Sequence, residues 1–563
     1  MALDGVLDAI LAVATLTLRA TAILFTRFHP LGKRYLNRIY GSLALYIGGI
    51  LLRLLLPTGP ARSPKRRHPV LILLLGCVDR TSPLASFSTV VLNLLSLGAV
   101  WDFLYRGHFA HQSNELFFSR LGYVDETTAR VVVRSPISPI TYVEITWSPS
   151  LRSGDEPPRS TTISVAESND YVGTFSLDGL EPDTEYTYGT NASHSGVFRT
   201  AAASPKRWSL ISTSCIKPFY PYSPADHALR IRGLEHLDHY LATDPADMML
   251  FLGDFIYIDL PVALGWTTEH YTTAYRQVYA SPSWSPALRS LPWLHVYDDH
   301  EIINDWAANE TGLYQSAMRP FWAYHGHANP ASQFGLGETY YTFRRGDVSF
   351  FVLDTRRYRS AEALEDGPGK TMLGPAQLSD LQRWLRTEKA WKVVVSSVPF
   401  TRNWRGADAA DSWAGYLWER DMVLDEMRQT DGVIILSGVS GVLSRLNGFQ
   451  GVISATNPEV GFVQDRHEHA TTVFPPNEKG GKAVIEFSTS PLNQFYEPFD
   501  RFHRQIEDTD VSVYSHPWGN SKFGKVSFDT SEPNRLKVKY DLVVDGGKVW
   551  DYVWEYTRSP VGF

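Results

Sequence analysis

Cysteine is nearly absent from this chain of 563 residues. The two cysteines are Cys77, inside an apolar stretch, and Cys215, far away in the sequence. Small secreted domains that depend on disulfides contain many cysteines, so a disulfide framework is excluded. Cys215 is therefore expected to be a free thiol, and its position needs another explanation.

Basic residues are scarce in most of the chain. Residues 1–110 carry 12 Lys and Arg against 4 Asp and Glu, whereas the remainder carries 41 against 56. Nucleic-acid binding requires basic stripes, so the acidic remainder excludes nucleic acid as a main partner. A basic and apolar N-terminal region suits a membrane. The sequence also lacks repeats and low-complexity tracts, and its length predicts two or three domains.

Long apolar runs are confined to residues 1–110. They are Ala9–Phe25, Ser42–Leu56 and Leu84–Leu104, with the shorter run Val70–Val78. A membrane span needs roughly 20 mostly apolar residues, so residues 1–110 are predicted to be a membrane anchor with three or four hydrophobic helices. Helices lying in one leaflet are the alternative. A cleaved signal peptide fits poorly, because acidic residues replace its usual basic start.

The orientation of the anchor is left open by its charges. Basic residues within 33–38 would hold the first loop in the cytosol, but those within 62–67 favour the opposite side. Three spans and four spans put the remaining chain on opposite faces. The sequons at Asn191 and Asn309 slightly favour a lumenal or extracellular face.

Residues 119–203 are predicted to form a small β-sandwich. Four short segments alternate or are β-branched: Ala129–Arg134, Tyr142–Trp147, Thr161–Val165 and Val172–Leu177. The stretch 180–188 (LEPDTEYTY) resembles a fibronectin-like corner, in which a tyrosine bonds back across a turn. We expect a structural role for this domain.

From residue 206 onward, strand and helix patterns alternate. Apolar residues recur at helical spacing in Ala225–Thr243, which is predicted to be a helix packed on a sheet. Predicted strands include Trp208–Ser212, Met248–Leu252, Leu294–Tyr297, Val348–Leu353, Val393–Ser397 and Val433–Leu436. The C-terminal part returns to β-structure.

Residues suited to metal binding follow four of these strands. Cys215 follows the first, Asp254 and Tyr257 the second, and Asp298-Asp-His-Glu301 the third, with Asn304 one turn later; Asp354 and Arg356-Arg357 follow another. Open α/β folds bind ligands at the carboxyl ends of their strands. Carboxylates gathered there must be protonated, dispersed or neutralised by cations. Oxygen ligands suit calcium or magnesium, whereas a thiolate and a phenolate suit iron.

Ordinary structural roles compete at each of these positions. Asp254 could cap a helix, Cys215 could be a small buried hydrophobe, and Tyr257 could be core packing. Not all of Asp298–Glu301 can bind a metal directly, so one is expected to cap a helix and another to orient a ligand. Arg356 and Arg357 would bind the substrate phosphate or pair with carboxylates.

At these residues the chain resembles the alkaline phosphatase D (PhoD-like) family of metallophosphoesterases. The matching motifs are STSC (212–215), LGDFIY (252–257), DDHEIINDW (298–306), VLDTRRYR (352–359) and EFSTSPL (486–492). The resemblance covers about residues 119–560. It implies a layered α/β/β/α metallophosphoesterase domain over 206–560, preceded by the β-sandwich and the N-terminal transmembrane helices.

The resemblance also implies a pair of metals, Fe³⁺ and Ca²⁺, although other divalent metals are an alternative. Cys215 and Tyr257 would bind iron, Asp254 would bridge both metals, and Asn304 would be a calcium ligand. Asp465 would complete the cage. Asp254, Asn304, His467 and Arg356 are the residues expected to act in catalysis.

The last family motif, Gly-Asp-x-His, is interrupted in this chain. Gly438 is followed by Val439–Gln464, and Asp465-Arg-His467 appears only after these 26 residues. Removing them restores LSGDRHEH. Val-Ser can be encoded by GTGAGT and the final Gln by CAG, which are ordinary intron borders. Our hypothesis is that Val439–Gln464 is a retained intron; a genuine surface insertion is the alternative.

These observations predict a membrane-anchored, metal-dependent phosphoesterase that hydrolyses phosphomonoesters or phosphodiesters with a metal-activated hydroxide. The anchor would suit a lipid-linked or surface phosphate substrate, and nothing in the sequence selects one of them. One alternative is a catalytically impaired membrane protein with a binding role, because the Gly-Asp-x-His motif is interrupted. Another is a calcineurin-like dinuclear enzyme, but few histidines stand at strand ends here.

Overall fold

The computed structural model describes residues 2–55, 68–79, 81–136, 141–151, 157–192, 194–307, 309–404, 409–438, 443–444, 462–463, 467–496 and 503–558. The chain forms two compact units. The helical unit consists of Met1–His111 with two later segments, Phe219–Ala228 and Leu260–Ala263, and the body contains the rest.

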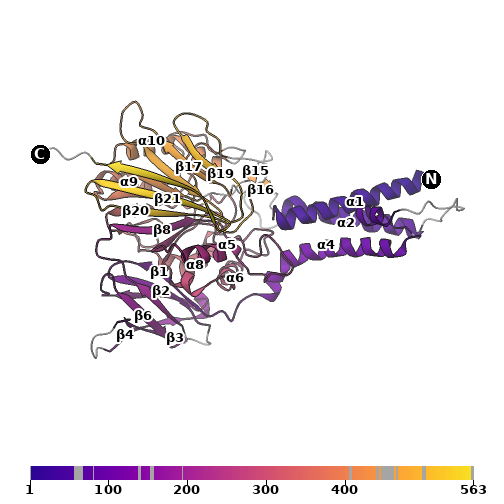
Figure 1. Cartoon of the computed structure of the whole chain (residues 1–563), viewed down its shortest axis with the longest axis horizontal. Helices are drawn as coiled ribbons and strands as arrows, with labels where there is room; N and C mark the ends of the chain where they lie inside the picture. Colours follow the sequence, from indigo (N-terminus) through magenta and orange to yellow (C-terminus); the bar gives the residue numbers. More distant parts are fainter. Residues whose placement is uncertain are drawn as a thin grey trace. The chain divides into compact units, whose positions relative to one another are not determined.

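Three long apolar helices form the bulk of the helical unit. The unit contains α1 (Ala2–Arg27), α2 (Gly32–Leu55), α3 (Pro69–Leu75) and α4 (Pro83–Ala110). Figure 1 shows α1, α2 and α4 side by side. Gly5–Arg27, Arg34–Leu55 and Pro83–Ala110 are long and apolar enough to cross a membrane. The prediction of three such helices is confirmed, and the fourth apolar run forms only the seven-residue α3.

A partly buried polar network joins α1, α3 and α4. The Arg19 guanidinium donates to Asn93 Oδ1 at 2.7 Å, to the Leu73 carbonyl at 2.6 Å and to Thr89 Oγ1 at 2.9 Å. Asn93 donates in turn to Thr15 Oγ1 at 3.1 Å. A cation among apolar helices is costly unless polar groups surround it, so these bonds explain how Arg19 is accommodated and why α3 stays attached.

The two later segments of the helical unit pack where α1 ends and α2 begins. The backbone N–H of Tyr222 donates to the Thr26 carbonyl at 3.1 Å, and that of Gly32 donates to the Pro261 carbonyl at 2.9 Å. A Cβ atom on Gly32 would lie 2.1 Å from the same carbonyl oxygen, so only glycine permits this approach. Two segments that come after residue 215 in the sequence are therefore part of the helical unit.

The body begins with the predicted β-sandwich. One sheet has the order β1-β2-β5 and the other β4-β3-β6-β7. The strands are β1 (Phe118–Val124), β2 (Thr128–Arg134), β3 (Thr141–Pro149), β4 (Arg159–Val165), β5 (Val172–Asp178), β6 (Glu185–Thr190) and β7 (Ser195–Arg199). The Tyr186 hydroxyl accepts the backbone N–H of Glu181 at 2.9 Å, which is the bond back across the turn that the corner motif indicates.

Two mixed sheets form the centre of the remaining body. The first has the order β10-β9-β8-β20-β21-β22 and the second β11-β12-β13-β14-β18-β17-β19. The first contains β8 (Arg207–Thr213), β9 (Met248–Leu252), β10 (Trp293–Val296), β20 (Lys522–Asp529), β21 (Arg535–Val544) and β22 (Gly547–Thr557). The second contains β11 (Tyr341–Arg345), β12 (Val348–Val352), β13 (Trp391–Ser396), β14 (Val433–Ser437), β17 (His469–Phe474), β18 (Val484–Thr489) and β19 (Val511–His516). β8, β9 and β10 run parallel, so their carboxyl ends share one edge.

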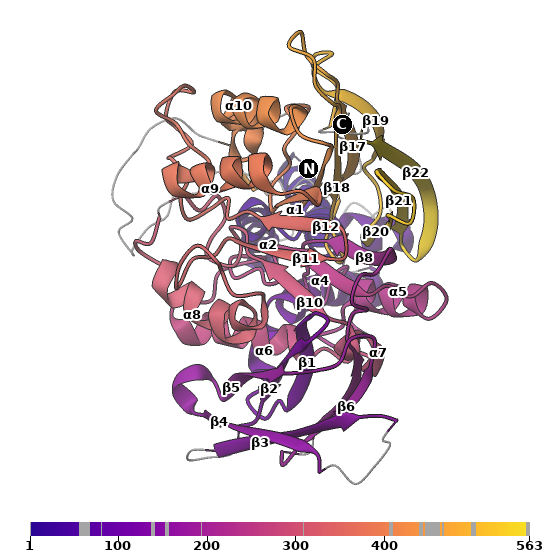
Figure 2. The same cartoon turned by 90° about the vertical axis from the view of Figure 1, so that its left-hand side faces the viewer.

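Alternation along β9 shows how the layers form. Leu250 and Leu252 pack in the core between the two sheets, whereas Met249 and Phe251 face the outer core beneath the helices. The helices are α5 (Arg232–Leu241), α6 (Thr268–Tyr279), α7 (Pro286–Ser290), α8 (Tyr314–Tyr324), α9 (Gly374–Thr387) and α10 (Leu417–Arg428). Side chains of α9 and α10 share a core with β12, β13 and β14, and Figure 2 shows these two helices together. The result is the predicted α/β/β/α layering.

One predicted helix is shorter than expected. The pattern over residues 225–243 predicted a single helix, but α5 begins only at Arg232. The prediction was wrong at this end because residues up to Ala228 pack with the helical unit.

Candidate metal centre

Two tight turns present Cys215 and Asp254 at the shared edge of β8 and β9. Cys215 has a φ of 65° and Asp254 a φ of 58°, both in the left-handed region that residues with a Cβ rarely adopt. Gly253 has a φ of 107°, and a Cβ atom there would lie 2.6 Å from Asp298 Cβ. The chain thus bends sharply where each strand ends and turns these two side chains inward.

Four of the predicted site residues meet within hydrogen-bond distance. Cys215 Sγ lies 3.3 Å from Asp254 Oδ2, and the Tyr257 hydroxyl donates to the same oxygen at 3.1 Å. His467 Nε2 lies 3.2 Å from the Tyr257 hydroxyl. All four side chains are buried, with Cys215 at 0% and Asp254 at 1% exposure. A thiol, a carboxylate, a phenol and an imidazole therefore converge on one point.

The pKa shifts of Asp254 and Cys215 show why a cation would suit this cluster. Burial raises the pKa of Asp254 well above its ordinary value; His300 opposes this shift, whereas the charges of Asp299, Asp298 and Glu301 add to it. Burial and the neighbouring Asp254 likewise raise the pKa of the Cys215 thiol. A nearby cation would reverse both shifts, because positive charge favours the ionised carboxylate and thiolate. The donor set therefore suits a bound metal.

Asn304 provides an independent test of that fit. Its side-chain Oδ1 and Nδ2 are buried and have no hydrogen-bond partner among the described residues, while its backbone N–H donates to Asp259 Oδ2 at 2.9 Å. Asp259 also holds His300 Nδ1 at 2.7 Å. Buried polar atoms are nearly always satisfied, so a free amide oxygen here fits the role of a ligand for a hard cation.

Carboxylates beyond the predicted set also gather nearby. Ligand atoms of Asp254, Asp299 and His300 lie within 4.8 Å of one another, as do those of Asp299, Asp305 and Asp411. Asp305 belongs to the DDHEIINDW motif, which also contains Asn304. Asp411 belongs to none of the motifs and lies well beyond the end of β13 in the sequence. No local pattern could have indicated Asp411.

Arg356 has different partners from those expected of a substrate-binding residue. Its Nε donates to Asp298 Oδ1 at 2.6 Å and its Nη1 to Asp411 Oδ1 at 2.7 Å, and Nη2 bonds both carboxylates. The side chain is fully buried. Burial lowers the pKa of Arg356, but Asp298, Asp299 and Asp411 more than compensate and raise it well above its ordinary value. Of the two roles considered for Arg356, the structure shows pairing with carboxylates.

The residues flanking the interrupted motif contact the same turn. A Cβ on Gly438 would lie 3.1 Å from the Leu252 carbonyl oxygen, and His467 reaches Tyr257. Lys522 Nζ donates to the His467 carbonyl at 2.9 Å. Asp465 and most of Val439–Gln464 lie outside the described residues. Gly438 and His467, the described residues on the two sides of the interruption, therefore both lie beside Leu252–Tyr257.

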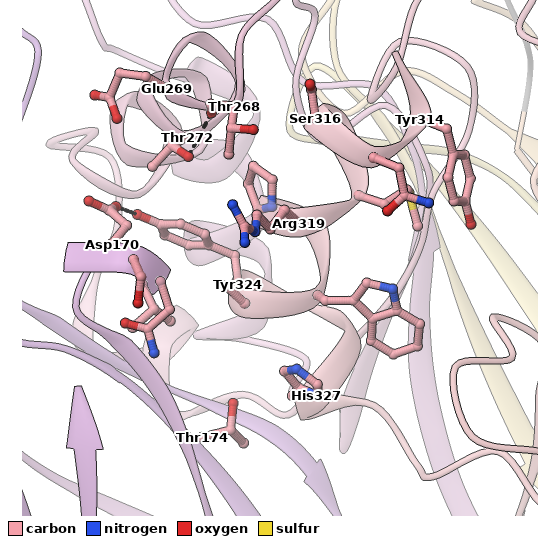
Figure 3. Close-up of a pocket in the computed structure, with 18 of the residues that line it drawn as sticks. Asp170, Thr174, Thr268, Glu269, Thr272, Tyr314, Ser316, Arg319, Tyr324 and His327 are labelled. Atoms are coloured by element: carbon pink, nitrogen blue, oxygen red, sulfur yellow. Dashed lines mark hydrogen bonds between the residues drawn. The ribbon is translucent and has the colours of Figure 1, made fainter. Parts of the chain in front are cut away.

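A separate cavity of about 1060 Å³ lies between the sandwich and the helices of the body. Figure 3 shows Arg319 of α8 inside it, together with Tyr324 and Asp170. Its lining includes Arg357 but no described residue of the candidate metal set. The cavity and the candidate metal centre are thus different features of the body.

Comparisons with known proteins agree with the motifs. The PhoD-like phosphatase family model matches residues 233–440, which include Asp254, Tyr257, Asn304 and Arg356. Alkaline phosphatase D of Bacillus subtilis (strain 168) is 27% identical over 307 residues, which are 46% of this chain and 52% of that protein. The match thus spans about half of the relative's length. Cys215 and His467 lie outside the residues that the family model matches.

A solved structure of PhoD shares the fold. A structure of PhoD matches with a TM-score of 0.57 and 18% identity, over 78% of this chain and 89% of that one. A purple acid phosphatase from yellow lupin (Lupinus luteus) matches with a TM-score of 0.49 and 14% identity, over 78% of this chain and 74% of that one. The family model and the PhoD fold confirm the resemblance that the motifs indicated: this chain is similar to the PhoD-like phosphatases.

Proposed function

We propose that this protein is a membrane-anchored, metal-dependent phosphoesterase that hydrolyses phosphomonoesters or phosphodiesters. The observation that supports this proposal most is a cluster of four buried side chains joined by contacts of 3.1 to 3.3 Å. They are Cys215, Asp254, Tyr257 and His467. The three long apolar helices support the anchor. Asn191 and Asn309, the first residues of two sequons, are exposed and slightly favour a lumenal or extracellular body.

Each site residue has a proposed task. Cys215, Asp254 and Tyr257 would hold Fe³⁺, while Asp254 and Asn304 would hold Ca²⁺. Asp465 would complete the cage. Bound metals supply a hydroxide at neutral pH and polarise the phosphoryl oxygen. The Tyr257 hydroxyl donates to Asp254 Oδ2 at 3.1 Å, so its oxygen lies beside the carboxylate with which it would share the iron. His467 Nε2, at 3.2 Å from that hydroxyl, is placed to hold a proton beside it.

Visible absorption is the direct test of the iron site. The full chain loaded with ferric iron is expected to be coloured, because thiolate and phenolate ligands on Fe³⁺ absorb visible light. Cys215→Ser should shift or abolish the band. Cys77→Ser is the matched control, since Cys77 lies in the helical unit and should leave the band unchanged. A colourless loaded protein, or equal spectra for both variants, would contradict the site.

A catalytically impaired binding protein is the second candidate, favoured by the interrupted Gly-Asp-x-His motif. This candidate predicts that iron binds weakly with or without Val439–Gln464. The enzyme predicts tight binding once the cage is complete. Iron affinity in the two chains therefore separates the two functions.

A lipid-linked phosphoester is the substrate class we favour. The helical unit takes in Phe219–Ala228 and Leu260–Ala263, and these segments follow Cys215 and Asp259 closely in the sequence. In vesicles containing the full chain, kcat/KM for a phosphomonoester on a lipid should exceed that for its short-chain soluble analogue at least about tenfold, because confinement raises effective concentration. Equal values for the two substrates would contradict this preference but not the phosphoesterase itself.

A further inference from the structure

Three backbone N–H groups from two strand-end turns converge on the Glu301 carboxylate. Asp254 donates to Oε2 at 3.0 Å and Phe255 donates to Oε1 at 2.6 Å. Asp298 donates to Oε2 at 2.8 Å. Glu301 is itself fully buried. One side chain therefore ties the turn after β9 to the turn after β10.

The turn after β9, which these bonds hold, has an unfavourable backbone conformation. Asp254 has a left-handed φ of 58°, a conformation that a residue with a Cβ adopts only when its surroundings enforce it. Just past the end of β9, its N–H and that of Phe255 require acceptors from elsewhere in the structure. An ionised carboxylate is a strong acceptor for such groups, and Glu301 uses both of its oxygens.

We infer that Glu301 is the positioning residue for Asp254 in the metal centre, an inference that rests on the proposed function. Simple capping explains only the bond from Asp298, three residues earlier in the same loop. The bonds from Asp254 and Phe255 cross between strands and fix the backbone from which the Asp254 carboxylate projects. Both Glu301 oxygens accept backbone N–H groups, so Glu301 would act through Asp254 by setting where Asp254 Oδ2 meets Cys215 and Tyr257.

The second sheet contains a matched control for this device. Glu486 is fully buried and accepts the backbone N–H of Phe400 at 2.6 Å and of Thr401 at 2.9 Å. It also accepts the Ser437 hydroxyl at 2.6 Å. Glu486 thus has the same chemistry, burial and number of donors as Glu301, but none of its three donors belongs to a predicted metal ligand.

Isosteric substitution separates positioning from general stability. In Glu301→Gln and Glu486→Gln, an amide NH₂ replaces one acceptor and faces a backbone or hydroxyl donor, so both variants should lose thermal stability to a similar degree. Ferric iron titration of the full chain should show an affinity about 10–100-fold lower for E301Q only, the range expected for loss of a ligand-orienting partner. The visible band should shift in E301Q and stay unchanged in E486Q.

Glu301→Asp provides a milder variant in case E301Q does not fold. It keeps both acceptors but withdraws them by one methylene, so its iron affinity should fall in the same direction. A folded E301Q or E301D with the affinity and spectrum of the original chain would overturn the inference, as would an equal loss of iron in E486Q. Failure of both the original chain and the chain without Val439–Gln464 to bind ferric iron would instead refute the proposed function.

Discussion

Deleting Val439–Gln464 should raise ferric iron affinity and phosphatase activity by about a hundredfold, the factor that a misplacement of about 1 Å costs at a catalytic site. Gly438 is held by Ser396 and Ser488, and His467 is held by Tyr257 and Lys522. The deletion leaves two residues, Asp465 and Arg466, to join these fixed points. Asp465 would then follow β14 directly, as Asp254 follows β9.

The described residues of the insert support such a join. Leu443 pairs with Val463, and Ser444 pairs with Phe462, as two short antiparallel strands. Paired antiparallel strands lie about 5 Å apart, so the two described pieces of the insert lie next to each other. We expect an insert that folds back on itself in this way to be removable with little movement of Gly438 or His467.

Two controls make the deletion decisive. Asp465→Ala in the shortened chain should return iron affinity to the level of the full chain, because it removes the ligand that the deletion is expected to place. Transcript sequencing across the join should show that the shorter message predominates. An abundant longer message that yields a fully active protein would refute the retained-intron hypothesis and leave Val439–Gln464 as a genuine insertion.

Replacing Asp254 with Asn is expected to lower kcat at least about a thousandfold, since metal stabilisation of the transition state contributes several kcal/mol. The substitution preserves the size of the side chain but removes the charge that would bridge the metals. Exposed Asp183, which lies in the β-sandwich and pairs with Arg199, provides the control substitution Asp183→Asn. That variant should keep its full activity.

The stability of the metal-free D254N protein gives a second readout. Burial raises the pKa of Asp254 well above its ordinary value, so the metal-free protein favours the neutral acid at this position. Asparagine is neutral, and the thermal midpoint without metal should therefore stay the same or rise. Loss of activity together with loss of fold would point to a structural role for Asp254, and retained activity would refute the metal assignment.

Local pattern in the sequence was enough to predict the framework. The apolar runs before residue 110 gave three long helices, because a span depends mainly on length and composition. The short apolar run Met248–Leu252 predicted a buried strand, and Leu250 and Met249 do face opposite cores. The gathering of Cys215, Asp254 and Tyr257 was predictable too, since parallel strands bring their carboxyl ends to one edge.

Only the tertiary structure decided which partner each charged side chain takes. Arg356 pairs with Asp298 and Asp411, and nothing near Arg356 in the sequence indicates a carboxylate 55 residues away. Glu301 could have been an ordinary cap, but the cross-strand bonds to Asp254 and Phe255 give it a wider role. Periodicity reports which face of an element is buried. It carries no information about long-range pairing, which depends on how the layers pack.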